Sequence, residues 1–190
     1  MFWWLQAARQ ARQEMMKIAY TSSRDSGDTD SLLASLAEIL IEQGMRIRGA
    51  VQINRDGGNN GPCDMDVKVL PDGPFIRISQ SRGKEARGCR LDPSALEAAV
   101  GLVETSFAEG ADLLIVSKFG KHEAEGRGFR ALVAEAVARE IPVLVGLSGL
   151  NEPAFKDYAG GLATELAPCL EELLTWLEVK NIGAECSFLS

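Results

Sequence analysis

The sequence predicts an α/β protein of three layers, in which a mostly parallel sheet lies between two layers of helices. Short apolar runs that suit buried strands alternate with longer runs that show helical spacing. Residues 112–117 and 141–147 are continuously apolar, as expected for strands that are covered on both faces. Residues 64–81 add a β-hairpin, either as an insert or at the edge of the sheet.

The first strand is expected at residues 17–20, before a polar loop that is rich in turn-forming residues. Leucines and isoleucines at helical spacing follow it, so a helix is expected from about Asp30, with a cap among residues 29–31 and its end at Gly44. A second strand covers residues 46–53. This order of strand, helix and strand predicts a right-handed crossover and parallel pairing of the two strands.

The hairpin is expected from two strand-like runs at residues 65–70 and 75–80. The four residues between them, Pro71 to Pro74, form a typical connection of a hairpin. Further along, Asp92 is placed to cap a helix that has Pro93 at its first position and runs to about Ala108.

Two more helices are expected, over residues 128–139 and 168–179. The length of 190 residues suits one domain, residues 16–190, preceded by an extension of residues 1–15. This extension is either a short helix or upstream sequence, with a helix lying on a membrane surface as the alternative.

Charge and hydropathy exclude several classes of protein. With 20 basic and 27 acidic residues the net charge is −7, which argues against a nucleic-acid-binding protein. The apolar start precedes the first basic residues, which reverses the order of a signal peptide. No apolar run approaches the ~18 residues of a spanning helix, so we expect a cytoplasmic protein without an integral membrane segment.

The four cysteines include no CxxC pair, so the sequence predicts no metal site. Cys63 and Cys89 lie in the two loops that flank the hairpin, among polar residues. Two thiols without histidine are a poor set of zinc ligands, and packing or a free thiol beside arginine is the preferred interpretation.

The loop at residues 21–31 stands where a phosphate-binding P-loop would stand, between a strand and a helix. A P-loop reads GxxxxGK followed by Ser or Thr, and here Gly27 and Thr29 match its second glycine and its hydroxyl. Ser22 replaces the first glycine and Asp28 replaces the lysine. The loop is therefore a degenerate Walker A sequence.

This loop remains a candidate anion site, because a helix N-terminus offers free N–H groups and a partial positive charge. The residues expected to hold the ligand here are Ser22, Ser23, Gly27 and Thr29. The alternative is a capping loop rich in hydroxyl and Asp side chains that binds nothing.

The second candidate loop follows the strand that ends near Ser117 and carries most of the reactive side chains. Lys118, Lys121 and Arg127 are expected to contact an anion, because ligands bind at the carboxyl ends of parallel strands. His122 is the single histidine and cannot form a metal shell alone. A solvated charged loop is the alternative interpretation.

The run from Ala111, ADLLIVSKFGKHEAEGRGF, resembles a bacterial family of unknown function whose members are similar to P-loop nucleoside triphosphatases. Some members are found near molybdate-uptake genes. The resemblance covers about residues 17–170, and FGKHEAEGRG is its most specific stretch. It implies a P-loop-NTPase-like fold.

This stretch is also similar to the DEIGKxE segment of an archaeal and eukaryotic nucleoside-triphosphatase family. Gly120, Lys121 and Glu123 match its GKxE part, whereas Ser117 and Lys118 stand where that family has Asp-Glu. The comparison therefore implies that the carboxylate associated with magnesium is absent.

The sequence thus predicts a protein that binds a nucleotide or another small anion at residues 22–31 and 118–127, without efficient hydrolysis. The ligand is expected to be a nucleotide, with Mg²⁺ in the case of a P-loop enzyme, or molybdate. Three alternatives stay open: a molybdate or oxyanion accessory protein, an active nucleoside-triphosphatase-like phosphohydrolase with Glu123 as its catalytic residue, and a non-catalytic regulatory or scaffold protein. A homodimer is also left open.

Overall fold

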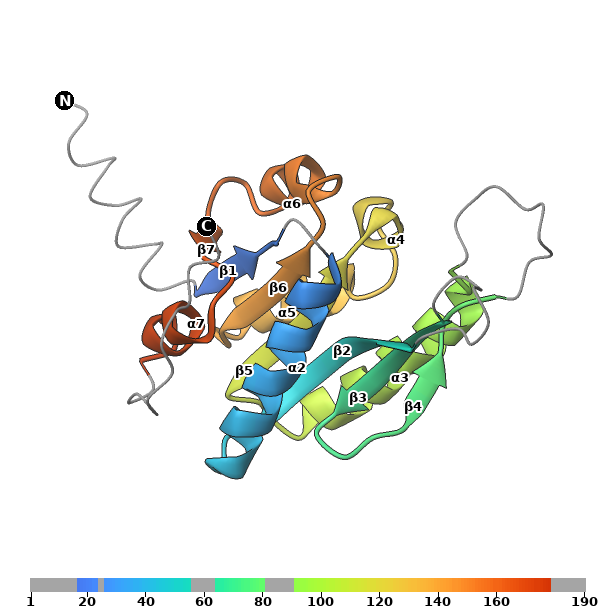
Figure 1. Cartoon of the computed structure of the whole chain (residues 1–190), viewed down its shortest axis with the longest axis horizontal. Helices are drawn as coiled ribbons and strands as arrows, with labels where there is room; N and C mark the ends of the chain where they lie inside the picture. Colours follow the sequence, from blue (N-terminus) through green and yellow to red (C-terminus); the bar gives the residue numbers. More distant parts are fainter. Residues whose placement is uncertain (1–16, 24–25, 56–63, 81–90, 179–190) are drawn as a thin grey trace.

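The structure is a computed structural model that describes residues 17–23, 26–55, 64–80 and 91–178. Within these ranges the chain forms a seven-stranded sheet in the order β4-β3-β2-β5-β6-β1-β7 (Figure 1). The strands are β1 (Ile18–Thr21), β2 (Ile47–Arg55), β3 (Asp64–Leu70), β4 (Phe75–Arg77), β5 (Leu113–Phe119), β6 (Val143–Leu147) and β7 (Thr164–Leu166). The helices are α2 (Ser26–Glu42), α3 (Pro93–Ala108), α4 (Lys121–Ala124), α5 (Arg130–Ala138), α6 (Glu152–Tyr158) and α7 (Leu170–Trp176).

The sheet is mostly parallel, as predicted. Strands β2, β5, β6, β1 and β7 run parallel to one another, and the hairpin of β3 and β4 pairs antiparallel with β2 at one edge. The hairpin connection is the predicted one, because β3 ends at Leu70 and β4 begins at Phe75. The expected hairpin at the edge of an α/β sheet is therefore confirmed.

The predicted pairing of the first two strands is wrong. β1 pairs with β6 and β7, and β2 pairs with β5 and β3, so two strands separate β1 from β2. Helix α2 accounts for this, because it packs across β2, β5 and β6 on its way from β1. The connection from β1 through α2 to β2 therefore crosses two strand positions in the sheet, which β5 and β6 occupy.

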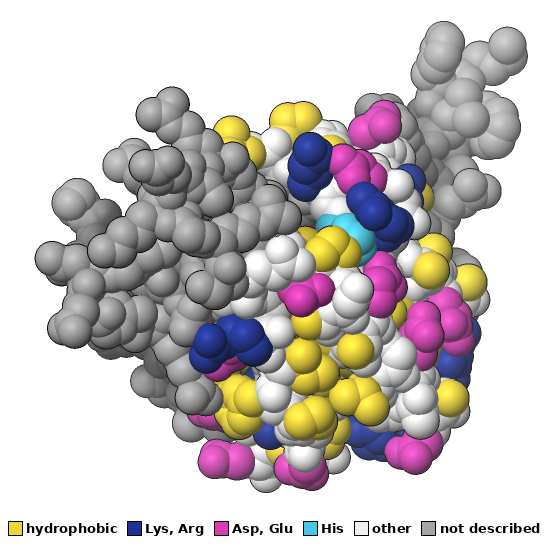
Figure 2. Space-filling view, turned by 90° about the vertical axis from the view of Figure 1, so that its right-hand side faces the viewer, with side chains coloured by type: hydrophobic (Ala, Val, Ile, Leu, Met, Phe, Trp, Pro, Cys, Tyr) yellow, Lys and Arg dark blue, Asp and Glu magenta, His cyan; other side chains and the backbone are white. Residues whose placement is uncertain are grey.

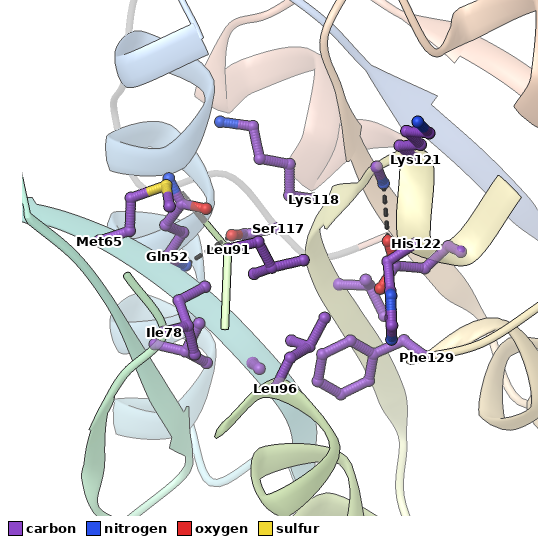
Figure 3. Close-up of a pocket in the computed structure, with 15 residues that line it drawn as sticks. Gln52, Met65, Ile78, Leu91, Leu96, Ser117, Lys118, Lys121, His122 and Phe129 are labelled. Carbon is purple, nitrogen blue, oxygen red and sulfur yellow. Dashed lines mark hydrogen bonds between the residues drawn. The ribbon is translucent and has the colours of Figure 1, made fainter. Parts of the chain in front are cut away.

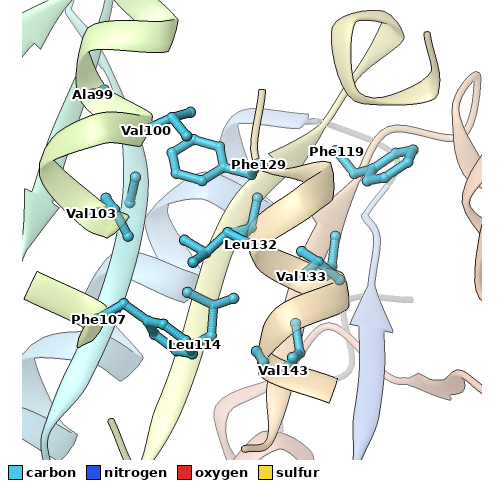
Figure 4. Close-up of a cluster of buried hydrophobic side chains, with 14 of the residues drawn as sticks. Ala99, Val100, Val103, Phe107, Leu114, Phe119, Phe129, Leu132, Val133 and Val143 are labelled. Atoms are coloured by element: carbon cyan, nitrogen blue, oxygen red, sulfur yellow. The ribbon is translucent and has the colours of Figure 1, made fainter. Parts of the chain in front are cut away.

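Helices cover both faces of the sheet and bury one apolar cluster on each side. On one face, Leu33 and Leu36 of α2 pack in a cluster with Ile115 and Leu144. On the other face, Phe107 of α3 and Leu132 of α5 belong to a cluster with Leu114 (Figure 4). This arrangement is the three-layer architecture expected from the sequence.

The start of α3 follows the predicted chemistry. The Asp92 carboxylate accepts hydrogen bonds from the backbone N–H groups of Ser94 and Ala95 at 3.0 and 3.2 Å. Pro93 occupies the first helical position, where a missing N–H costs nothing. Helix α3 then runs to Ala108, as expected.

Several boundaries differ from those expected. Helix α2 begins at Ser26 rather than near Asp30, so residues 29–31 lie inside the helix. The expected helix at 128–139 is α5, which begins at Arg130, and the one-turn helix α4 precedes it. The short elements α6 and β7 were not predicted, because seven and three residues are too few to show a clear periodicity.

Some expectations lie outside the described residues, namely those on residues 1–15, Cys63 and Cys89. Among the helices that the structure describes, none is both long enough and apolar enough to cross a membrane.

Candidate functional site

The parallel strands bring their carboxyl ends to one edge of the sheet, where the two predicted loops lie. Thr21 ends β1, Gln52 lies near the end of β2, and Lys118 lies near the end of β5. All three side chains are polar, and those of Thr21 and Gln52 are buried. This edge is where open α/β sheets place their ligands.

The first loop closes on the start of α2 through two hydroxyl side chains. The backbone N–H of Ser23 donates to Thr29 Oγ1 at 2.9 Å, and the two hydroxyl oxygens lie 2.8 Å apart. The structure therefore brings Ser23 and Thr29 together, as contacts that hold the loop. Ser22 is half-buried between β1 and this contact, and Gly27 lies in the first turn of α2.

Asp28, which stands where a P-loop has lysine, is exposed in the first turn of α2. A carboxylate at this place interacts favourably with the positive end of the helix dipole. The Asp28 carboxylate thus stabilises the start of α2 without a bound ligand.

Asp30 is the buried acid of this region and connects three elements. Its Oδ2 atom lies 3.6 Å from Lys118 Nζ of β5 and accepts a hydrogen bond from Asn54 Nδ2 of β2 at 3.1 Å. The Gln52 amide in turn donates to Asn54 Oδ1 at 2.8 Å. A chain of polar side chains therefore joins α2 to both strands.

Two buried polar atoms of the same region have no hydrogen-bond partner among the described residues, Asp30 Oδ1 and Thr21 Oγ1. Buried oxygens are normally satisfied, so such atoms are unusual. Desolvation by burial raises the pKa of Asp30 to about 6, although Lys118 and Asn54 act in the opposite direction. Asp30 therefore titrates close to neutral pH.

The other two cations of the prediction lie elsewhere on the second loop. Lys121 Nζ is 3.6 Å from a Glu125 carboxylate oxygen, and Arg127 donates to the same carboxylate at 2.6 Å. Both side chains are largely exposed. On the face shown in Figure 2, basic and acidic side chains stand next to each other around the single histidine. Of the three predicted cations, Lys118 is the one that forms an ion pair with α2.

Glu123, the predicted catalytic residue, is buried and faces its own backbone. Its Oε2 atom accepts the N–H of Gly120 at 2.8 Å. Burial raises the pKa of Glu123, and N–H groups of Gly120 and Phe129 counteract the rise. The carboxylate thus holds the loop around α4 in shape.

A second contact fixes this loop to α3. His122 Nε2 lies 2.8 Å from Glu97 Oε1, and the same oxygen accepts the N–H of Gly128 at 2.9 Å. These contacts lower the pKa of Glu97, with the His122 hydrogen bond as the largest cause. No local pattern in the sequence pointed to Glu97, which lies 25 residues from His122 on another helix.

A largely apolar cavity of about 180 Å³ opens between the hairpin, α3 and the end of β5 (Figure 3). Its apolar walls come from β2, β3, the residues after β4, α3 and the N-terminus of α5. The polar and charged side chains that also line it are those of Gln52, Ser117, Lys118, Lys121, His122 and Glu123. This cavity could not be predicted from the sequence, because its walls come from segments far apart in the chain.

The described residues do not fit the magnesium site that a P-loop enzyme would use. They contain no group of three or more His, Cys, Asp or Glu side chains that could hold a metal ion. Lys118 occupies the place beside Asp30, where its positive charge would repel a divalent ion. We therefore derive no step through magnesium.

Residues 18–176 match the sequence profile of a family described as "Protein of unknown function (DUF2478)". The chain belongs to the DUF2478 family. The match spans nearly all the described elements, from β1 to α7.

This DUF2478 chain is 37% identical over 150 residues to the molybdenum import ATP-binding protein ModC 2 of Bradyrhizobium diazoefficiens. The aligned part covers 79% of the chain and 17% of that larger protein. No solved structure matches the chain. Its α/β architecture, with helix α2 after β1 and parallel strands on either side, is compatible with a P-loop-NTPase-like fold.

Proposed function

We propose that this DUF2478 protein binds a small anion, foremost a nucleoside phosphate, between the N-terminus of α2 and Lys118. The contact between Lys118 and Asp30 carries the proposal, because it brings a cation of β5 to the second turn of α2, next to the N-terminal turn. The helix has 17 residues, and its N-terminal N–H groups favour negative charge. The buried oxygens of Thr21 and Asp30 add a polar lining with unused hydrogen-bonding capacity.

The protonation state of Asp30 controls how strongly the anion binds. When ionised it competes with the ligand for Lys118, because both are anions beside one ammonium group. Protonation removes this competition and turns the carboxyl into a donor toward the bound anion. Since the pKa of Asp30 is about 6, this exchange takes place near neutral pH. Ligand binding is thus coupled to uptake of a proton by Asp30.

Lys121 and Arg127 contribute less than Lys118 to the proposed site. Both are engaged by Glu125, and that ion pair must loosen before either cation meets the ligand. Lys121 also lines the cavity, as Lys118 does. Ser22, Ser23, Gly27 and Thr29 shape the loop on the opposite side of the anion.

We expect the protein to bind a nucleoside phosphate without hydrolysing it efficiently. Phosphoryl transfer needs positive charge on the outer phosphates and a positioned nucleophile. Asp28 stands at the position of the P-loop lysine, and Glu123 is directed to the backbone of its own loop. Neither side chain is placed to assist the reaction.

A free tetrahedral oxyanion such as molybdate is the second candidate ligand. The similarity to a molybdenum import ATP-binding protein favours this ligand. A lysine ammonium group is a compact point charge that serves a tetrahedral oxyanion as well as a phosphate ester.

Titration calorimetry with AMP, ATP, molybdate and sulfate tests the proposal on the wild type and on Lys118→Ala. A charge-assisted hydrogen bond is worth roughly 1.5–3 kcal/mol, so Lys118→Ala should weaken binding by about tenfold or more. Lys121→Ala and Arg127→Ala should have smaller effects. Lys68→Ala, which alters a lysine of the hairpin that donates to Gly73, serves as the control. Equal affinities in the wild type and Lys118→Ala would contradict the proposal.

A further inference from the structure

The cavity beside Lys118 indicates what kind of anion the protein selects. We propose that the cavity receives a ring of the ligand, so that the ligand is a ring-bearing phosphate whose anionic group meets Lys118. This inference rests on the proposed function, because it uses the same lysine. It favours a nucleoside phosphate or an aryl phosphate over a free oxyanion.

The walls of the cavity are suited to a flat apolar group. Figure 3 shows Ile78, Leu96 and Phe129 on one side and the Met65 thioether on another. Ile78, Leu96 and Phe129 are each at most 6% exposed, so the packing around them fixes their positions. Aromatic and thioether groups make favourable contacts with the face and edge of a ring.

The size of the cavity limits the group that enters. An apolar cavity of about 150 Å³ in another protein holds one benzene molecule. The cavity of about 180 Å³ therefore accepts a single ring system, and the rest of a nucleotide must stay outside. A hydrated oxyanion gains nothing from such walls, because they offer it few hydrogen bonds.

Lys118, Gln52 and Ser117 give the cavity polar groups on the side of β2 and β5. Lys118 lines the cavity, and its Nζ atom reaches Asp30 of α2, 3.6 Å away. Gln52 and Ser117 lie at the same end, joined by the hydrogen bond from Gln52 N to Ser117 Oγ. A single lysine thus connects the apolar cavity with the second turn of α2, so one ligand can contact the cavity and the start of this helix.

The place of the cavity also suits ligand binding. Its apolar walls lie next to a positively charged side chain at the edge of the sheet where the parallel strands end. A ring that enters it makes van der Waals contacts with these walls, and few polar groups among apolar walls are typical of small-molecule sites.

Calorimetry with phenyl phosphate and inorganic phosphate tests the inference directly. In the wild type, phenyl phosphate should bind at least about tenfold more tightly than inorganic phosphate, because burying its ring adds a hydrophobic contribution. Met65→Trp places a larger side chain at the half-buried wall and should remove this difference while phosphate affinity stays the same. Met45→Trp is the control, because Met45 is also half-buried but packs in the cluster under α2.

The outcomes separate this inference from the proposed function. Equal affinity of both probes in the wild type, with Lys118→Ala weakening both, would overturn the ring pocket and leave the anion site standing. Ring-dependent binding that Lys118→Ala leaves unchanged would support the pocket and contradict the anion site. Should Met65→Trp fail to fold, the melting temperature of the wild type with phenol decides: a rise supports the pocket, and no rise overturns it.

Discussion

Lys118 Nζ at the end of β5 lies 3.6 Å from Asp30 Oδ2 in α2, although β6 separates β5 from the strand that leads into α2. The length of the lysine side chain bridges this separation. The pair has one buried member, because the Asp30 side chain is 4% exposed and that of Lys118 is 31% exposed. Its energy therefore depends on the protonation state of Asp30.

We expect Asp30 to make stability depend on pH. The folded pKa of about 6 exceeds the ordinary value of 3.8, so the contribution of Asp30 is fully present below about pH 4 and is lost as pH rises through about 6. The shift corresponds to a loss on the order of 2–3 kcal/mol.

Denaturant unfolding of wild type and Asp30→Asn across this range measures the effect as a difference between the two proteins. Glu38→Gln, at an exposed position in the middle of the same helix, is the control and should follow the wild type. A constant difference between wild type and Asp30→Asn at all pH values would show that Asp30 does not titrate there.

Gly128→Ala should destabilise the protein by roughly 1–3 kcal/mol. Gly128 has φ of +58°, and an added Cβ would lie 2.3 Å from Glu123 Oε1. Gly126→Ala is the matched control, because φ there is +92° but a Cβ would meet nothing within 4 Å. Thermal melts compare the two variants, and equal losses of stability would argue against a fixed Glu123 carboxylate.

Glu97→Ala should lower the free energy of unfolding by roughly 1–3 kcal/mol, because it removes the acceptor of both His122 and the Gly128 N–H. The pKa of Glu97 is lowered in the fold, so this contribution is present above its unfolded pKa and is lost as pH falls through the folded pKa.

Glu104→Ala, at an exposed position of the same helix, is the control for Glu97→Ala in chemical denaturation near neutral and acid pH. If both variants lost the same stability, or if the loss in Glu97→Ala persisted unchanged in acid, the contact between α3 and α4 would not be the cause.

Hydrolysis of ATP or GTP should stay far below the ~1 s⁻¹ at the slow end of typical enzymes. Phosphate release with excess magnesium measures it, and Glu123→Gln should leave any residual rate unchanged. A rate in the enzymatic range that falls in Glu123→Gln would restore Glu123 as a catalytic residue.

The elements that the sequence predicted are those with strong local signals. Residues 113–117 are buried on both faces of the sheet, so their apolar character alone indicated β5. Asp92 and Pro93 mark the start of α3 by local hydrogen bonding and a fixed φ. Such features depend on a few adjacent residues and are visible without tertiary structure.

The features that the sequence missed depend on how distant segments pack. The placement of β5 and β6 between β1 and β2 follows from the path of α2 across the sheet. Asp30 was considered as a helix cap, because nothing near it in the sequence shows that Lys118 and Asn54 surround it. The cavity likewise arises only when the hairpin folds against α3.

The pH dependence of anion affinity tests the central claim most directly, which is that an anion takes the place of ionised Asp30 beside Lys118. Titration calorimetry with sulfate, whose charge is the same at about pH 5 and about pH 8, should show tighter binding to the wild type in acid, because protonation of Asp30 frees Lys118. Asp30→Asn should bind tightly at both values, and Lys118→Ala weakly at both. An affinity of the wild type that is the same at both pH values, or that Asp30→Asn leaves unchanged at about pH 8, would contradict the account.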